Sequence, residues 1–193
     1  QARSYLFNRC NFKAYLNGVS IYGFDGRICT YGITTPYDEV SQTEWFSQIQ
    51  SGQADVVYLT PHAYTSKQPS PKSSYVFSIV RPVLNNGTII GVIKADVKSS
   101  LLETIFDIQE MQGYALDVFD RDTGEAVYVP EGADTLPLTR FQDSVPRGHG
   151  SYTDQIGCAD CLVVYTTSEI TPWQIVGVVR QNTVISGFLQ VRN

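Results

Sequence analysis

The run Ile89-Ile90-Gly91-Val92-Ile93 returns later in the chain as Ile175-Val176-Gly177-Val178-Val179. Each run follows a strand–turn–strand pattern, at residues 21–28 in the first half and 116–127 in the second. The order is the same in both halves, with the hairpin first and the glycine-centred apolar strand last. Internal repetition of this kind indicates repeated structural units, so the sequence predicts two similar modules in tandem rather than one large domain.

Composition sets broad limits on fold and function. The 193 residues suffice for one large domain or two small ones, and 12 Tyr with 9 Phe favour sheet structure. The net charge of -5, with no basic patch, argues against nucleic-acid binding. No apolar run is long enough to span a bilayer. The chain begins at Gln1 without a signal peptide, so we expect an excised or mature part of a longer protein.

Hydrophobic periodicity predicts the elements of the first module. Residues 4–16 show helical spacing that ends at Asn17-Gly18, which is typical of the end of a longer helix. Ser41-Gln42-Thr43-Glu44 is a capping-box pattern and predicts a short helix after it. Prolines mark 61–74 as a long loop, of the kind that often carries function. Strands are predicted near 19–23, 27–31, 54–60, 75–85 and 88–97.

The second module is predicted from the same signals. A helix over 99–112 leads into it, and a Pro/Gly-rich loop covers 130–150. Its strands are predicted near 114–120, 125–129, 151–156, 161–167 and 173–180, with a last helix capped by Asn182. The fold class is therefore α+β, with antiparallel sheets flanked by helices. The predicted boundaries are 1–17 for the first helix, 18–97 and 113–180 for the modules, 98–112 for the connecting helix and 181–193 for the last helix.

The dipeptide Asn86-Gly87 is the strongest short hairpin signal and pairs Asn85 with Thr88. Strict alternation outward from that pair predicts a mixed face and a nearly apolar face, the latter to be covered by a helix. The mixed face would carry Tyr75, Phe77, Ile79, Arg81, Val92, Lys94 and Asp96.

Aromatic side chains beside both signs of charge suit a small charged ligand. On the mixed face, Asp96 could hold an ammonium group, and Arg81 or Lys94 could hold a carboxylate or hydroxyls. The alternative is an ordinary solvent-facing side of a sheet, on which Lys94 and Asp96 pair at the surface. The second module has Arg180 where the first has Lys94, and Asn182 where it has Asp96. We therefore expect the first module to be the one that binds a small molecule.

Ser78-Ile79-Val80-Arg81-Pro82-Val83, with the following residues 86–97, resembles the distal-module ending of double Cache (tandem PAS-like) extracellular sensor domains of bacterial transmembrane receptors. Residues 171–179 resemble the proximal-module ending of the same family. The resemblance extends over about the whole chain and is closest to the sensor regions of YesM-like histidine kinases of Gram-positive bacteria. It implies a membrane-distal ligand-binding module, a membrane-proximal module, a long N-terminal helix that is cut short here, and a C-terminal helix that leads to a transmembrane segment.

The amino-acid-binding branch of that family implies particular site residues. Trp45-Phe46 matches its aromatic pair imperfectly, and Asp96 matches its strand-end Asp. Thr43 stands where that branch has an Arg, and His62 follows Pro61 where it has a Tyr. The missing Arg removes the usual carboxylate clamp, which argues against an amino acid and leaves open a different solute in the same pocket. The candidate ligand contacts are Trp45, Phe46, His62, Tyr64, Tyr75, Phe77, Arg81, Lys94 and Asp96.

The cysteines favour structural roles. Cys158 and Cys161 have the spacing of a redox motif, but they lie in a predicted hairpin turn rather than at the helix N-terminus that lowers a thiol pKa. A structural disulfide or idle thiols therefore fit better than catalysis. Cys10 and Cys29 could form a second bridge. A zinc site is disfavoured because only one pair has ligand spacing, and we expect no cofactor.

The expected function is that of a sensor domain without catalytic activity, on the extracytoplasmic side of a bacterial membrane. Its distal module would bind a small extracellular solute, and the full-length receptor would be a homodimer with a histidine kinase as output. The first alternative is a module that dimerises without ligand or docks a solute-binding protein. The second is the sensor of a chemoreceptor or a diguanylate cyclase. A thiol oxidoreductase would require a reactive thiol in the Cys158–Cys161 pair.

Overall fold

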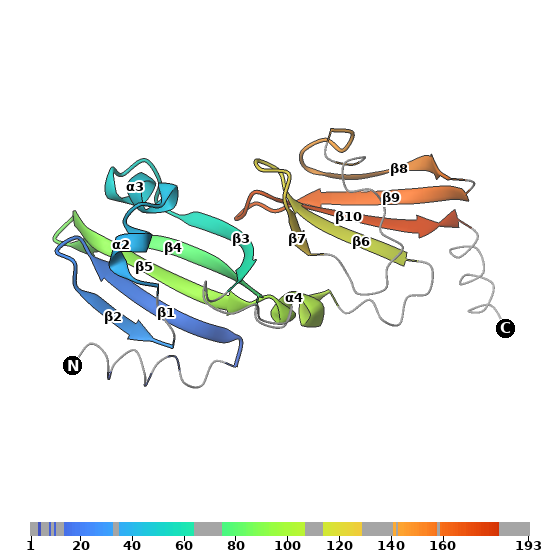
Figure 1. Cartoon of the computed structure of the whole chain (residues 1–193). Coiled ribbons are helices and arrows are strands. Elements are labelled where there is room, and N and C mark those ends of the chain that lie inside the picture. The colour runs from blue at the N-terminus through green and yellow to red at the C-terminus, as the bar shows by residue number, and fades with distance from the viewer. Residues whose placement is uncertain are drawn as a thin grey trace. The chain divides into compact units, whose positions relative to one another are not determined.

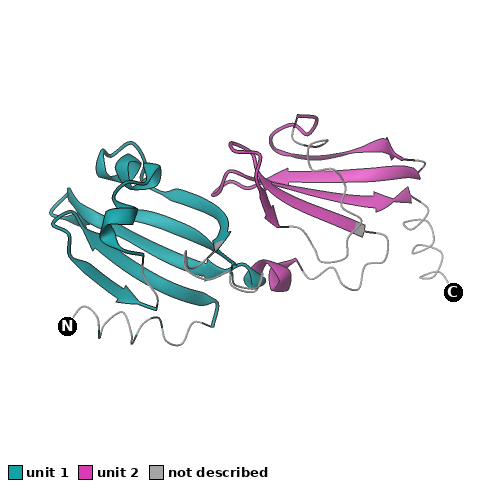
Figure 2. Cartoon of the chain, in the orientation of Figure 1, with its two compact units in different colours: residues 1–101 teal, residues 102–193 magenta. Residues whose placement is uncertain are grey.

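The structure is a computed structural model that describes residues 4, 8, 10, 14–32, 35–63, 75–106, 114–128, 141, 143–157 and 159–181. The chain divides into two compact units, Gln1–Leu101 and Leu102–Asn193 (Figure 2). Each unit is built on one five-stranded antiparallel sheet (Figure 1). The predicted tandem arrangement of two sheet modules is therefore confirmed.

The first sheet has the strand order β2-β1-β5-β4-β3. Two short helices, α2 (Tyr37–Val40) and α3 (Glu44–Gln50), cover one of its faces (Figure 1). A third short helix, α4 (Ser100–Ile105), follows the last strand. The strands are β1 (Leu16–Gly23), β2 (Ile28–Tyr31), β3 (Val57–Ala63), β4 (Tyr75–Asn85) and β5 (Thr88–Lys98).

The second sheet repeats the strand order of the first. Its strand order is β7-β6-β10-β9-β8, so β10 occupies the central position that β5 occupies in the first sheet. These are the two strands that carry the repeated glycine-centred run. The strands are β6 (Tyr114–Asp120), β7 (Ala126–Tyr128), β8 (His149–Ile156), β9 (Ala159–Thr167) and β10 (Trp173–Arg180).

The β4–β5 hairpin turns where the sequence predicts it. Asn86 and Gly87 both adopt positive φ, 48° and 81°, the conformation that a two-residue type I′ turn requires. Asn85 pairs with Thr88, as expected. This turn explains why an Asn-Gly dipeptide stands at the tip of the hairpin.

The register changes two residues beyond the turn. Leu84 still pairs with Ile89, but Val83 pairs with Gly91, so that Ile90 is an extra residue on β5. An extra, unpaired residue in one strand of a ladder is a β-bulge. A shift of one residue moves every later side chain of one strand to the other face relative to its partner.

The bulge corrects the predicted faces of this hairpin. Val76, Ser78 and Val80 share a face with Lys94 and Asp96, because Ser78 pairs with Asp96 and Val80 with Lys94. We call this side the α3 face. Tyr75, Phe77 and Arg81 lie on the opposite side, so the prediction that placed them beside Lys94 and Asp96 was wrong.

Position 91, next to the bulge, requires a glycine for a steric reason. A Cβ at this position would clash with the carbonyl oxygen of Tyr22 and lie 3.1 Å from Cα of Gly23. Strands β1 and β5 thus approach too closely here for any side chain.

The core of the first unit lies between α3 and the sheet. Phe46 is 1% exposed and is surrounded by the rings of Phe24, Tyr37 and Trp45, at centroid distances of 5.6, 5.9 and 6.0 Å. Helix α3 is predicted correctly, but the capping box is not formed. Its N-cap is Thr43, whose Oγ1 donates to the carbonyl oxygen of Val40 at 2.7 Å instead.

The opposite side of the sheet packs against Cys10. Cys10, which is helical, is buried with Val19 against Cys29, Ile93 and Ala95. The expectation of a helix on this side is met at Cys10. Cys10 and Cys29 are free thiols, which corrects the predicted second bridge, and both act as small apolar residues in this cluster.

Several other predictions need correction or lie outside the described residues. His62 belongs to β3 and not to the loop. Phe141 and Val145 are buried core residues inside the predicted loop 130–150. Cys161 is a buried free thiol that donates to the carbonyl oxygen of Ala159 at 3.6 Å. Most of residues 1–13, Tyr64, residues 107–112, Cys158 and residues 182–193 are not described. None of the helices in the described part of the chain has both the length and the apolarity needed to cross a membrane.

Candidate ligand site

A buried polar cluster lies on the α3 face, beyond the aromatic core along β5. Lys94 Nζ and Ser78 Oγ both donate to Oδ1 of Asp96, Ser78 at 2.5 Å. The cluster continues to β3, because Ser78 Oγ lies 3.2 Å from Nε2 of His62. Nδ1 of His62 is 2.8 Å from the carbonyl oxygen of Thr60. Three neighbouring strands therefore contribute to one hydrogen-bonded chain.

Three side chains of the cluster are almost fully buried, and Lys94 retains a small exposed fraction. Ser78 is 0%, Asp96 3% and Lys94 8% exposed. Gly18, which pairs with Asp96 on β1, contributes no side chain beside the carboxylate. Burying a charged pair is costly unless it is well hydrogen-bonded, so this arrangement is not one that packing alone would favour.

Counting hydrogens shows that the chain of contacts among the described residues is incomplete. The carbonyl of Thr60 only accepts, so Nδ1 of His62 carries a hydrogen. In a neutral imidazole Nε2 is then an acceptor. Ser78 has one hydroxyl hydrogen, and Nε2 and the Asp96 carboxylate compete for it. With His62 neutral and Asp96 ionised, the hydrogen bonds among the described residues leave the cluster one donor short.

The electrostatics support a neutral His62. Burial lowers the pKa of His62 below its ordinary value of 6.5, and the charge of Lys94 adds to this, whereas the hydrogen bond to Thr60 and the charge of Asp96 act in the opposite direction. The positive charge of Lys94 balances the negative charge of Asp96. At neutral pH the cluster therefore carries no net charge.

A second polar pair adjoins the first on the same face. Ser20 pairs with Lys94 across β1 and β5 and is 1% exposed. Its hydroxyl lies 3.2 Å from that of Thr30 on β2. Hydroxyl groups thus flank the ion pair from both β1 and β4.

The structure brings together three of the predicted ligand contacts, His62, Lys94 and Asp96. Trp45 and Phe46 lie on the same face in the aromatic core, where Phe46 is a packing residue. Because of the bulge, the side chains of Tyr75, Phe77 and Arg81 lie on the other face of the sheet, where Tyr75 and Arg81 are exposed. Tyr64 lies outside the described residues.

Ser78 is the site residue that sequence reasoning missed. Strict alternation from the turn places it on the apolar side, away from Asp96. The signal that could have found it is Gly91, because a glycine inside an otherwise apolar strand suggests a bulge or a close backbone approach. A bulge at that point reverses the assignment.

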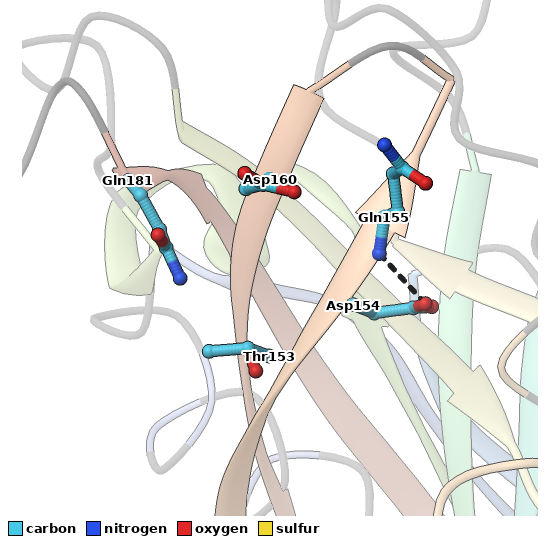
Figure 3. A pocket seen from close by; sticks show the side chains of 5 residues that line it. All are labelled: Thr153, Asp154, Gln155, Asp160 and Gln181. Atoms are coloured by element: carbon cyan, nitrogen blue, oxygen red, sulfur yellow. Dashed lines mark hydrogen bonds between the residues drawn. The ribbon is translucent and has the colours of Figure 1, made fainter.

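The second unit contains a groove of about 380 Å³ at the β8–β9 hairpin (Figure 3). All of its lining residues are polar, and the backbone N–H of Gln155 donates to Asp154 Oδ1 at 2.8 Å. Ligand sites usually combine apolar walls with a few polar groups, which this groove does not. Its lining residues are Thr153, Asp154, Gln155, Asp160 and Gln181. In the residues that the structure describes, no group of three or more His, Cys, Asp or Glu side chains could hold a metal ion.

The core of the second unit contains polar groups that are not fully satisfied. Gln174 is 0% exposed, and its Oε1 accepts from Arg121 Nη1 at 2.9 Å and from Thr167 Oγ1 at 2.8 Å, while its Nε2 has no partner among the described residues. Asp117 is equally without a partner at Oδ2, and burial raises its pKa to about 6. Arg180, which stands where Lys94 stands in the first unit, is exposed. The ion-paired cluster thus has no counterpart in the described part of the second unit.

Comparison with known proteins identifies the fold. No protein-family model matches the sequence, and no curated protein matches it. Among solved structures, the extracellular domain of rpHK1S-Z16, assigned as a histidine kinase, aligns with a TM-score of 0.64 at 18% identity, covering 96% of this chain and 79% of that one. This chain has the fold of bacterial receptor sensory domains.

Two further neighbours were solved with ligands bound. The sensory domain of the Campylobacter jejuni chemoreceptor Tlp3, with isoleucine bound, aligns with a TM-score of 0.61 at 13% identity, covering 93% of this chain and 71% of that one. The ligand-binding domain of the Pseudomonas aeruginosa amino acid chemoreceptor PctC, in complex with GABA, aligns with a TM-score of 0.64 at 14% identity, covering 88% and 76%. The similarity thus spans both units.

Proposed function

We propose that this chain is the extracytoplasmic sensing part of a bacterial transmembrane receptor, without catalytic activity of its own. Its first unit binds a small solute on the α3 face, at the cluster of His62, Ser78, Lys94 and Asp96. The output is a histidine kinase of the YesM-like type, and the receptor is a homodimer. The shared fold supports the sensory role, and one neighbour with this fold is assigned as a histidine kinase.

The observation that carries the proposal is that the described residues alone do not complete the hydrogen bonding of this buried cluster. Buried polar side chains are normally satisfied, yet Ser78 cannot serve both His62 and Asp96 with one hydrogen. A purely structural role would be filled better by apolar residues of similar size. A bound solute that donates a hydrogen bond would complete the cluster.

Signalling would follow from a difference in affinity between two states. A ligand shifts a conformational equilibrium only if it binds one arrangement more tightly than the other. The cluster joins β3, β4 and β5, so a solute bound there contacts strands that end next to the connection between the units. Strand β5 leads directly into α4.

A thermal-shift screen of the chain against amino acids, organic acids, amines and oligosaccharides tests this function. A solute present at 100 times its Kd stabilises the folded state by about 2.7 kcal/mol. We expect a hit that Ser78→Ala abolishes and Arg81→Ala, on the opposite side, retains. A screen without hits would favour the docking of a solute-binding protein, and a hit that survives Ser78→Ala would place the site elsewhere.

A further inference from the structure

We infer that Lys94 occupies, from within the chain, the place at Asp96 that a ligand ammonium group would take, and that the site consequently binds an uncharged ligand through hydroxyl groups. The ligand class is that of polyols and sugars. This inference rests on the proposed function, since it assumes that the cluster on the α3 face is the binding site.

The tether between the two charges excludes a ligand cation. Lys94 and Asp96 are two residues apart on β5, so they project from the same face and their ion pair forms within one strand. Their side chains are only 11% and 5% exposed. A free ammonium group would have to displace a partner that is always present at high effective concentration. It would also leave the charge of Lys94 buried without a partner, which is strongly unfavourable.

The same pair excludes a ligand anion. A carboxylate that approached Lys94 would meet the charge of Asp96, which Lys94 already contacts. His62 is held neutral and supplies no second positive charge. Arg81, a candidate for a carboxylate clamp in the sequence, lies exposed on the other side of the sheet. An anion would therefore enter the described cluster without net compensation for its own desolvation.

A hydroxyl group fits the cluster because it both donates and accepts. The Lys94 ammonium has three hydrogens and a carboxylate about four acceptor positions, and in the described part of the chain Lys94 uses one and Asp96 two. A ligand hydroxyl can accept from Lys94 and donate to Asp96, which frees the hydrogen of Ser78 for His62. The hydrogen of this hydroxyl is the donor that the cluster lacks.

The test compares uncharged and charged probes on the intact chain by isothermal titration calorimetry. The uncharged arm contains glucose, xylose, maltose, myo-inositol and glycerol, and the charged arm contains isoleucine, GABA, arginine and succinate. We expect binding in the uncharged arm alone. In Lys94→Met, where Asp96 is left without its cation, we expect affinity for the uncharged probe to fall at least tenfold and ammonium probes to begin to bind.

The double variant Lys94→Met, Asp96→Leu is the control for the case in which Lys94→Met fails to fold. It removes both charges together and is expected to fold and to bind neither class of probe. Binding of an amino acid or of succinate to the unaltered chain, lost in Asp96→Asn, would overturn the ligand class and leave the proposed function intact. No binding in either arm would overturn both. Retention of an uncharged probe by the double variant would overturn the assignment of these residues.

Discussion

Lys94 and Asp96 project from the same face of β5 and pair with each other through Oδ1 of Asp96, to which Ser78 also donates. The Ser78 contact depends on a one-residue bulge at Ile90, without which β4 would present Phe77 rather than Ser78 to Asp96. A local irregularity of the backbone thus decides the chemistry of the α3 face.

Breaking the ion pair should destabilise the first unit more than removing it entirely. Lys94→Met leaves a buried, uncompensated carboxylate and is expected to cost about 3–5 kcal/mol. Lys94→Met, Asp96→Leu should recover most of that loss, because neither charge remains. Urea denaturation of both variants, following the transition of the first unit, measures the difference. Equal stability of the single and double variants would show that the pair is not buried as described.

The stability of the first unit should fall in mild acid because of His62. Its pKa in the folded state is lowered, so between that value and 6.5 the unfolded chain binds more protons than the folded one. Its contribution to stability is therefore fully present above pH 6.5 and is lost as the pH falls toward the folded-state pKa. Thermal melts between pH 5 and 8 should show this slope in the wild type and less of it in His62→Gln. An identical slope in the variant would assign the effect to other groups.

Substitution of Gly91 tests the close approach of β1 and β5. A Cβ at Gly91 meets the backbone of Tyr22 and Gly23, which cannot move away as a flexible side chain can. Gly91→Ala should therefore cost several kcal/mol, toward the upper end of overpacking effects. Gly87→Ala is the matched control, because Gly87 has a φ of 81° but nothing within 4 Å, and should cost only the left-handed backbone penalty of about 1–2 kcal/mol. If both variants melt alike, β1 and β5 do not approach as closely as described.

The second unit should lose stability with rising pH through Asp117. Burial raises its folded-state pKa from 3.8 to about 6, so the folded state holds the proton more tightly than the unfolded chain. The resulting stabilisation is fully present below about pH 4 and is lost as the pH rises through 6, an effect of about 3 kcal/mol. Asp117→Asn removes the titration, so its advantage over the wild type should grow between pH 4.5 and pH 7.5. A constant difference across this range would contradict the raised pKa.

The fold was largely predictable because each module is specified by local signals. The Asn86-Gly87 turn and the glycine-centred runs of β5 and β10 fix the hairpins and the central strands, and their repetition predicts two sheets. The capping box failed because Thr43 satisfies the carbonyl of Val40, a contact that depends on the short helix α2. The buried residues Phe141 and Val145 were missed because single core positions in a Pro/Gly-rich sequence produce no periodic apolar pattern.

The site was only half predictable. Lys94 and Asp96 stand out as charges inside an apolar strand, and His62 as one of two histidines. Their grouping with Ser78 depends on the register of β4 against β5, which the bulge shifts after the predicted turn. Alternation propagates such an error along the whole strand, so Tyr75, Phe77 and Arg81 were assigned to the wrong side by one miscounted residue.

The central claim is that a solute binds on the α3 face of the first unit. Chemical-shift mapping by ¹⁵N NMR, with the solute that stabilises the chain in the thermal screen, tests it most directly. The account predicts that the largest amide shifts cluster on β3, β4 and β5, around Ser78, Lys94 and Asp96. Shifts confined to the second unit, around the groove formed by Thr153 and Asp160, would contradict it.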